Sequence, residues 1–330
     1  MVLGKFLPPH LGHKYLVDFA LGYVRDLTVV VGTLASEPIP GSLRHRWMRD
    51  AFPDARVLHL DEALPQAPAG PHDQRFWDLW RTALARLCPD PDFIFASESY
   101  GHRLAREMGA RFVAVDPDRE LVPISATAIR ADPMAGWDWI LPQARPHFLK
   151  RVAIVGPEST GKTVLARRLA AHYGTVHMAE YARGFLAQHD NRCDDIALIG
   201  TIARAQAAGE DAVARQARRL LIADTDTLTT VLWCRHFFGH CPDWIVRLAD
   251  ARAHDLYLVL DLAPYAPDPQ RFHPREETRR QFRDDLVAGL AARRRRWTLI
   301  GGDWDQRYAA ACHEIDRLLA DPSPPVRSGD

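Results

Sequence analysis

The chain has 330 residues, enough for two domains of ordinary size, each with its own hydrophobic core. Lysine and arginine together number 42, as do aspartate and glutamate, so no net positive charge attracts nucleic acid or an anionic membrane. No apolar run approaches the length of a membrane span, no secretion signal opens the chain, and five cysteines are too few for a disulfide scaffold. Composition therefore predicts a cytoplasmic globular protein with neither nucleic acid nor membrane as a partner.

In the first half of the chain, short apolar runs alternate with helical stretches. A brief apolar start at residues 1–3 precedes a helical stretch at 14–21. Buried strands are then predicted at residues 29–32, 56–60, 93–96 and 111–115, with helices at 75–87 and 101–108. Such alternation predicts a parallel sheet that binds ligands at the carboxyl ends of its strands.

Two separated motifs in this half suit a polyphosphate. His10-x-Gly12-His13 places two imidazoles at a helix start, where they can donate hydrogen bonds to phosphate, more strongly if its charge protonates them. Further on, Ser125 and Arg130 belong to a second predicted helix start that offers hydroxyls and a guanidinium to an anion. Alone, the histidines are also typical of a structural or metal pair, and the hydroxyls of ordinary helix caps. The two motifs together favour a nucleotide site.

The second half repeats the alternation of strand and helix. Strands are predicted at residues 152–155, 175–178, 220–223, 256–260 and 297–301, with helices at 164–173 and 196–219. A proline-interrupted stretch at residues 142–147 separates the halves. We therefore expect domains at residues 1–149 and 150–320, followed by a flexible tail at 321–330.

Residues 156–163 read Gly-Pro-Glu-Ser-Thr-Gly-Lys-Thr and connect a predicted strand to a predicted helix. This is the P-loop pattern in its required context. Its glycines let backbone N–H groups face phosphate oxygens, Lys162 reaches the outer phosphates, and the Thr163 hydroxyl coordinates Mg²⁺. The pattern predicts a nucleoside triphosphate site.

Two carboxylates beside the P-loop are candidates for the chemistry. Asp224 ends a predicted strand and is placed to hold Mg²⁺, although an aspartate after a strand is commonly a turn residue. Glu180 and Arg183 follow another strand and are suited to orient an acceptor hydroxyl, although they also fit a surface ion pair. Which of Glu180, Asp224 and Asp226 acts as the base stays open.

An arginine-dense segment at residues 268–280 fits a lid that closes over the transferred phosphoryl group, or equally a solvated cationic loop. Tyr265, which lies just before this segment, is placed to stack on the ring of a ligand, although tyrosines more often pack in the protein core.

Cys234 and Cys241 lack zinc-finger spacing, and we expect a packed helix end there. Trp77 and Trp80 lie one helical turn apart, and we expect mainly core packing, with one of them a candidate to stack on a ligand.

The patterns G-K-F-x-P-x-H-x-G-H and I-S-x-T-x-x-R resemble the nucleotidylyltransferase superfamily, and the continuation into the P-loop resembles the NadR family. NadR proteins join a nicotinamide mononucleotide adenylyltransferase to a ribosylnicotinamide kinase, and the resemblance covers nearly the whole chain. It implies an α/β fold with a Rossmann-like nucleotidylyltransferase domain followed by a P-loop kinase domain. Some members also carry an N-terminal helix-turn-helix, which we expect to be absent because Gly4 lies so near the first residue. The short first strand makes a weakened first activity one alternative.

The resemblance implies two reactions of NAD biosynthesis, phosphorylation of ribosylnicotinamide by MgATP and adenylyl transfer from ATP to the mononucleotide. The small-molecule partners are therefore ATP, ribosylnicotinamide, nicotinamide mononucleotide and NAD, and self-association is left open. For adenylyl transfer, the expected catalytic residues are Lys5, His10, His13 and Arg130, and the expected ATP-binding residues are Gly4, Phe6, Gly12, Ser125 and Thr127.

For phosphoryl transfer, the expected catalytic residues are Lys162, Glu180 and Asp224. Thr163 and Asp224 are the expected ligands of Mg²⁺, the cofactor. ATP is expected to contact Gly156, Glu158, Ser159, Thr160, Gly161, Thr163 and Val164. The expected substrate-binding residues are Trp77, Tyr181, Arg183, Asp226, Tyr265, Arg271 and Arg275. Two alternatives are a nucleotide-sensing regulator with one silent half, and the same reactions on another cofactor precursor.

Overall fold

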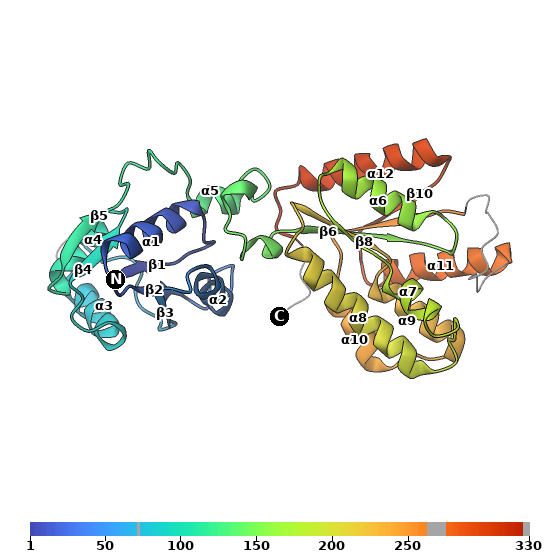
Figure 1. Ribbon diagram of the computed structural model, residues 1–330, viewed down its shortest axis with the longest axis horizontal. Helices are drawn as coiled ribbons and strands as arrows, with labels where there is room; N and C mark the ends of the chain where they lie inside the picture. Colours follow the sequence, from blue (N-terminus) through green and yellow to red (C-terminus); the bar gives the residue numbers. More distant parts are fainter. Residues whose placement is uncertain (71–72, 263–274, 326–330) are drawn as a thin grey trace. The chain divides into compact units, whose positions relative to one another are not determined.

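The computed structural model describes residues 1–70, 73–262 and 275–325. The chain divides into two compact units, Met1–Arg145 and Pro146–Asp330 (Figure 1). Each unit contains a five-stranded, all-parallel sheet with helices on both faces. The expected fold class, two parallel-sheet α/β domains, is confirmed.

The first sheet has the order β3-β2-β1-β4-β5. Its strands are β1 (Val2–Gly4), β2 (Thr28–Gly32), β3 (Arg56–Leu60), β4 (Phe93–Ala96) and β5 (Arg111–Ala114). Strand β1 is short, yet it lies at the centre of the sheet and pairs with both β2 and β4. Strand order reverses there, which is where parallel α/β sheets bind ligands.

Helices cover both faces of the first sheet. They are α1 (Leu11–Tyr23), α2 (Gly41–Ala51), α3 (Gln74–Leu87), α4 (Tyr100–Glu107) and the short α5 (Ala126–Ala131). Because side chains alternate along a strand, Val29 and Val31 pack against α1 and α2, whereas Val30 packs with α3 and α4. Both faces of the strands are apolar, as expected of a buried parallel sheet.

The second sheet has the order β10-β9-β6-β8-β7. Its strands are β6 (Lys150–Val155), β7 (His177–Met178), β8 (Leu220–Asp224), β9 (Leu256–Leu260) and β10 (Trp297–Ile300). The central β6 lies between β8 and β9, so strand order reverses beside it as well. The P-loop follows β6, and Asp224 ends the adjacent β8.

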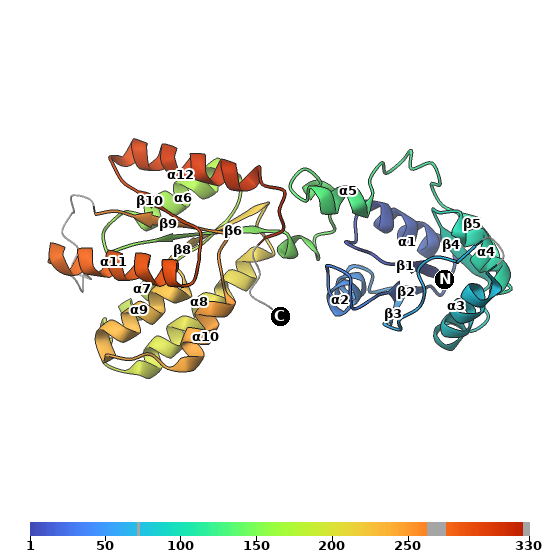
Figure 2. The ribbon, with the colours of Figure 1, turned by 180° about the vertical axis from the view of Figure 1, so that it is seen from behind.

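Two groups of helices sandwich this second sheet (Figure 2). Helices α6 (Lys162–His172) and α12 (Trp304–Leu319) pack on the face formed by Val152 and Ile154. On the opposite face, Ala153 and Val155 pack with α8 (Ile196–Ala214), α9 (Thr227–Phe238), α10 (Asp243–Ala251) and α11 (Glu276–Ala292). A shorter helix, α7 (Tyr181–Ala187), contacts α8.

Several boundaries differ from the sequence prediction by a few residues, among them those of α1, α8 and β7. Helix α1 begins at Leu11, three residues early, which makes His10 its N-cap. Helix α8 ends at Ala214 because the chain turns back into β8, and Arg219 there has a φ of 61°, which no α-helix accommodates. Strand β7 has only two residues, and upstream the Thr175 hydroxyl donates to the Leu220 carbonyl in place of a backbone ladder bond. Among the described residues, no helix has the length and apolar character needed to cross a membrane.

Leu258→Ala should lower the free energy of unfolding by about 2–5 kcal/mol, because Leu258 on β9 is fully buried and truncation leaves a cavity. Leu299→Ala on the neighbouring β10 is the matched control, since that side chain is 46% exposed and should change stability by less than about 0.5 kcal/mol. Guanidinium denaturation followed by circular dichroism measures both. Equal losses in the two variants would contradict the assigned core.

Candidate active sites

The first unit contains an open cleft of about 500 Å³ at the carboxyl ends of its central strands. Ligand sites for small molecules usually measure about 300–1,000 Å³, so this cleft has the size of such a site. Every residue expected in the first site lines the cleft except Trp77; these are Gly4, Lys5, Phe6, His10, Gly12, His13, Ser125, Thr127 and Arg130. The fold thus brings the two sequence motifs together.

The two histidines cap helix α1 reciprocally, and this fixes their tautomers. His10 Nδ1 accepts a hydrogen bond from the Gly12 N–H at 3.1 Å, and His13 Nδ1 accepts from the His10 N–H at 3.3 Å. A ring nitrogen that accepts carries no proton, so the proton of each neutral ring lies on Nε2. Each imidazole therefore keeps an Nε2–H donor for a ligand in the cleft.

Both imidazoles are neutral in the ligand-free protein. Burial lowers the pKa of His10 to about 4, and the positive charge of Arg119 adds to this. Burial, His10 and Arg119 together lower the pKa of His13 well below its ordinary value. The rings lie only 3.8 Å apart between centroids, so charging both would be costly. The protein thus provides neutral donors before a phosphate arrives.

The main chain of Lys5 is held by a buried arginine, Arg44, which no sequence motif indicated. Arg44 is fully buried and donates to the carbonyls of Lys5 at 2.7 Å and Ile39 at 3.1 Å, and it also pairs with Glu37. The Lys5 ammonium lies 3.0 Å from the same Glu37 carboxylate. Burial tends to raise the pKa of Glu37, but hydrogen bonds from Leu34, Lys5 and Arg44 outweigh it and lower that pKa. A single arginine in an amphipathic helix carries no sequence pattern from which a contact with the Lys5 carbonyl could be predicted.

The second motif, around Ser125 and Arg130, caps helix α5 and forms a hydrogen bond to the first motif. The Ser125 hydroxyl accepts from the Ala128 N–H at 3.1 Å and so caps α5. Arg130 bonds the Thr127 hydroxyl at 3.1 Å and the carbonyl of Leu7, which lies in the loop of the first motif. One guanidinium thereby links the two motifs across the cleft.

Two lining residues differ from the expectation. Trp80 lines the cleft, and its indole donates to the Pro65 carbonyl at 2.9 Å. Trp77 instead packs edge-on against Phe76 and under the Arg103 guanidinium. Helical spacing alone cannot decide which of two tryptophans one turn apart faces a ligand. Arg119 also lines the cleft, 3.3 Å from Glu98, and no motif indicated it.

The P-loop of the second unit is held in its phosphate-binding form by its glycines. Gly156 has a φ of 144°, and a Cβ there would lie 2.7 Å from the Leu260 carbonyl oxygen. Gly161 has a φ of 89°, and a Cβ there would lie 2.1 Å from the Trp304 ring. The Lys162 ammonium donates to the Gly156 carbonyl at 3.1 Å and the Pro157 carbonyl at 2.9 Å. Any side chain at either glycine would therefore distort the loop.

Thr163 and Asp224 meet beside this loop. The Thr163 hydroxyl donates to Asp224 Oδ2 at 2.6 Å. Asp224 is fully buried, and its Oδ1 has no hydrogen-bond partner among the described residues. A buried carboxylate oxygen without a partner next to a P-loop hydroxyl suits a hydrated divalent cation. The residues present therefore fit Mg²⁺.

A pocket opens in front of the P-loop. Its polar lining residues are Glu158, Ser159, Lys162, Glu180, Arg183, Asn191, Thr225, Thr229 and Thr230. Its apolar lining residues include Leu186, Ile199, Ile202, Trp233 and Phe237, and Cys193 lines it as well. No sequence pattern indicated Trp233, because a tryptophan within a helix is more often a core residue.

Glu180 lines the pocket, and its environment suits a carboxylate that accepts a proton. Burial raises its pKa, as does the charge of Asp224, while Lys162 and Arg183 oppose the rise. Arg183 Nε lies 3.6 Å from Glu180 Oε2, so the i,i+3 pair predicted as an alternative is present at the pocket wall. A carboxylate with a raised pKa in a cleft is a candidate proton acceptor.

Several expected contact residues lie elsewhere. Asp226 is buried and caps α9, accepting from the Thr229 N–H at 2.9 Å and the Thr229 hydroxyl at 2.8 Å, and it is not among the described lining residues. Tyr181 stacks on Phe185 instead, Val164 is exposed, and Arg275 is the exposed residue before α11. Tyr265 and Arg271 lie outside the described residues.

The structure places a helix end where zinc binding was considered. Helix α9 ends at Phe238 and is terminated by Gly239, whose φ is 73°. Cys234 is buried within this helix. Across residues 1–70, 73–262 and 275–325, no group of three or more His, Cys, Asp or Glu residues forms a metal cluster.

The neutral histidines give a test by nuclear magnetic resonance. At pH 6, long-range ¹⁵N–¹H correlations of the ligand-free protein should show His10 and His13 with a single proton, on Nε2, because burial lowers the pKa of His10 to about 4 and lowers that of His13 well below its ordinary value. The first unit should lose stability as the pH falls from about 6.5 to about 4, since the unfolded imidazoles take up protons there and the folded ones do not. Doubly protonated rings at pH 6 would contradict the assignment.

Comparison with known proteins agrees with both units. A family model described as an AAA domain matches residues 151–307. The chain is 28% identical to the trifunctional NAD biosynthesis/regulator protein NadR of Escherichia coli strain K12, over 97% of this chain and 82% of that protein. It is 25% identical to the nicotinamide-nucleotide adenylyltransferase of Pyrobaculum neutrophilum, over 45% of this chain and 85% of that protein.

Solved structures show the same fold. A NadR protein in complex with NR superimposes with a TM-score of 0.80 at 24% identity, covering 100% of this chain and 97% of that one. A NadR protein in complex with NAD and AMP-PNP also gives a TM-score of 0.80, at 22% identity. The NadR proteins of Escherichia coli and Salmonella typhimurium, 28% and 26% identical over 97% of this chain, show that the chain is a homologue of NadR proteins.

Proposed function

We propose that this chain is a bifunctional enzyme of NAD biosynthesis. The second unit phosphorylates ribosylnicotinamide with MgATP, and the first unit transfers an adenylyl group from ATP to the resulting mononucleotide. The observation that carries this proposal is the presence in one chain of two clefts at strand-order reversals, each lined by phosphate-binding residues. We assign residues 1–149 to the adenylyltransferase, 150–320 to the kinase and 321–330 to a tail, and we place the enzyme in the cytoplasm.

In the kinase reaction, an acceptor hydroxyl attacks the γ-phosphorus of ATP, and ADP leaves. Lys162 and the P-loop N–H groups hold the phosphates, while Thr163 and Asp224 would hold Mg²⁺, which neutralises phosphate charge when bound. Glu180 lines the pocket and its raised pKa suits the acceptance of the hydroxyl proton. Asp226 is committed to capping α9, which leaves Glu180 as the base we propose.

The pocket lining also suits the proposed acceptor, ribosylnicotinamide. The pyridinium ring of ribosylnicotinamide is flat and positively charged, so the face of a tryptophan and a nearby carboxylate both attract it. Trp233 lies in the lining and stacks on Phe237 with ring centroids 5.4 Å apart. Glu180 and Arg183 also line the pocket and are available to the ribose hydroxyls.

In the adenylyl transfer, the phosphate of the mononucleotide attacks the α-phosphorus of ATP, and pyrophosphate leaves. This step needs no covalent enzyme intermediate, so the protein aligns the reactants and stabilises the charge that develops. The Nε2–H groups of His10 and His13, the Lys5 ammonium and the Arg130 guanidinium all line the cleft for this purpose. Arg119 is a further cation in the lining of the cleft.

His13→Ala should reduce adenylyl transfer by about 10²-fold or more and leave the kinase unchanged, because one donor to the developing charge is lost. Lys162→Ala should do the reverse. Both rates are measured by chromatography of products, with the exposed His102→Ala as a control that retains both activities. A folded variant that loses both activities would contradict the two-site assignment.

Asp224→Asn should lower kinase turnover by about 10²-fold, because the amide keeps the Thr163 hydrogen bond but removes the charge that holds Mg²⁺. Chelation of Mg²⁺ should have a similar effect on the wild-type kinase. Asp243→Asn, at an exposed position in the first turn of α10, is the control and should be fully active. Full kinase activity of Asp224→Asn would remove Asp224 from the metal site.

The central test supplies ribosylnicotinamide and MgATP to the wild-type protein and, separately, the mononucleotide and ATP. We expect nicotinamide mononucleotide in the first reaction and NAD with pyrophosphate in the second. Calorimetry run alongside separates the alternatives, since a nucleotide sensor would bind these molecules without forming product. Turnover of a different precursor alone would retain the reaction types and replace the substrate.

A further inference from the structure

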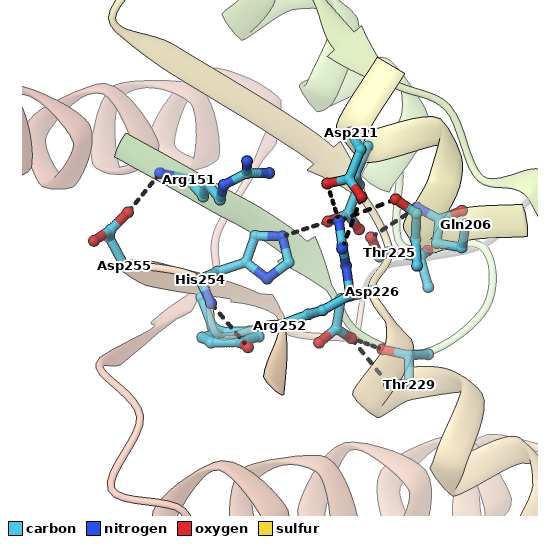
Figure 3. A network of polar contacts seen from close by, with 12 residues as sticks. Arg151, Gln206, Asp211, Thr225, Asp226, Thr229, Arg252, His254 and Asp255 are labelled. Atoms are coloured by element: carbon cyan, nitrogen blue, oxygen red, sulfur yellow. Dashed lines mark hydrogen bonds and ion pairs between the residues drawn. The ribbon is translucent and has the colours of Figure 1, made fainter. Parts of the chain in front are cut away.

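Gln206 lies in the middle of helix α8 and is almost completely buried. Its side-chain amide uses both ends on main-chain groups of two other segments. Oε1 accepts from the Tyr181 N–H at 3.0 Å. Nε2 donates to the Thr225 carbonyl at 3.4 Å (Figure 3). Tyr181 directly follows Glu180, and Thr225 directly follows Asp224.

We propose that Gln206 is a positioning residue of the phosphoryl-transfer site, whose single amide sets the Glu180 and Asp224 carboxylates around Lys162. This inference rests on the proposed kinase function of the second unit. Gln206 does not line the described pocket, so it acts through its two main-chain partners. Neither its spacing nor any motif indicated it.

The first contact leaves the Glu180 carboxylate available to the pocket. Glu180 is the N-cap residue of α7, yet its side chain makes no capping hydrogen bond. The first N–H groups of a helix need a partner, and a side chain at the N-cap usually provides it. Here Gln206 satisfies the Tyr181 N–H from a neighbouring helix. The Glu180 carboxylate can therefore lie in the pocket with Lys162 and Arg183.

The second contact fixes the main chain after Asp224. Thr225 has a φ of 75°, a left-handed conformation that is unfavourable for a β-branched residue and persists only when surrounding contacts enforce it. Two hydrogen bonds do so, from Thr225 N–H to the Ile154 carbonyl at 3.0 Å and from Gln206 to the Thr225 carbonyl. Relaxation of Thr225 would rotate the peptide next to Asp224 and shift its carboxylate relative to Thr163.

The same helix supplies a matched control one turn further on. Glu210 is also buried, and its carboxylate lies 3.4 Å from Arg252 and 3.7 Å from His254. Figure 3 shows this group continuing through Arg252 to Asp211. None of these four residues is among the described residues that line the kinase pocket. A change at Glu210 thus disturbs a buried polar contact of α8 without reaching the pocket.

The experiment compares Gln206→Met with Glu210→Gln in the full-length chain. Gln206→Met should lower kinase kcat about 10- to 100-fold with the KM for ATP within about twofold, because the P-loop is intact and only the alignment is lost. Adenylyl transfer should be unchanged in both variants. Glu210→Gln should lower the melting temperature and keep kinase kcat near that of the wild type.

Gln206→Glu gives a readout that a purely structural role would not produce. At high pH the new carboxylate accepts from Tyr181 but has no proton for the Thr225 carbonyl, whereas at low pH its hydroxyl can donate. The ratio of its kcat to that of the wild type should therefore rise as the pH falls. This variant also carries the test if Gln206→Met does not fold.

A Gln206→Met kcat at the wild-type level would overturn the inference, as would a loss no larger than that in Glu210→Gln. A pH-independent ratio for Gln206→Glu would overturn it as well. Failure of the wild-type protein to phosphorylate ribosylnicotinamide would instead count against the proposed function, so the two failures are distinguishable.

Discussion

A helix that begins at the carboxyl end of a central parallel strand leaves its first N–H groups unpaired, and the polar residues around them must be arranged to receive an anion. Both units place a cleft at such a point, beside β1 in the first and β6 in the second. The packing of the rest of each unit positions these helix starts. Apolar layers on both faces of each sheet fix the strand ends, and the strand ends fix the helix starts.

The two units prepare their helix starts differently. In the first, His10 and His13 cap α1 through their Nδ1 atoms, so capping and ligand binding use opposite sides of the same rings. In the second, the glycines at 156 and 161 keep side chains away, and Lys162 bonds the loop carbonyls. In both units burial disfavours the charged form of a site residue, so it lowers the pKa of His10 and raises the pKa of Glu180. The neutral imidazole of His10 is suited to donate a hydrogen bond to a phosphate, and the carboxylate of Glu180 is suited to accept a proton.

Planar side chains that bond the main chain hold the reacting groups in place. Arg44 fixes the main chain of Lys5, and Arg130 ties the two motifs of the first cleft. Gln206 connects the segments that carry Glu180 and Asp224. In each case a planar, multidentate side chain bonds main-chain carbonyls or N–H groups, which fixes backbone position more tightly than a contact between two flexible side chains would.

The sequence by itself determined the alternation of strands, the P-loop with Lys162 and Thr163, and the paired motifs around His10 and Arg130. These are local, because periodicity and glycine spacing act within a few residues. Only the tertiary structure decided that Trp80 and not Trp77 lines the first cleft, that Asp226 caps α9, and that Trp233 lines the second pocket. It also decided that Arg44 and Gln206 bond main-chain groups of Lys5 and Thr225, which line the two sites. The partners of Arg44 and Gln206 lie far along the chain, so no local pattern indicates them. Side-chain direction and long-range contacts arise only when the sheets and helices pack.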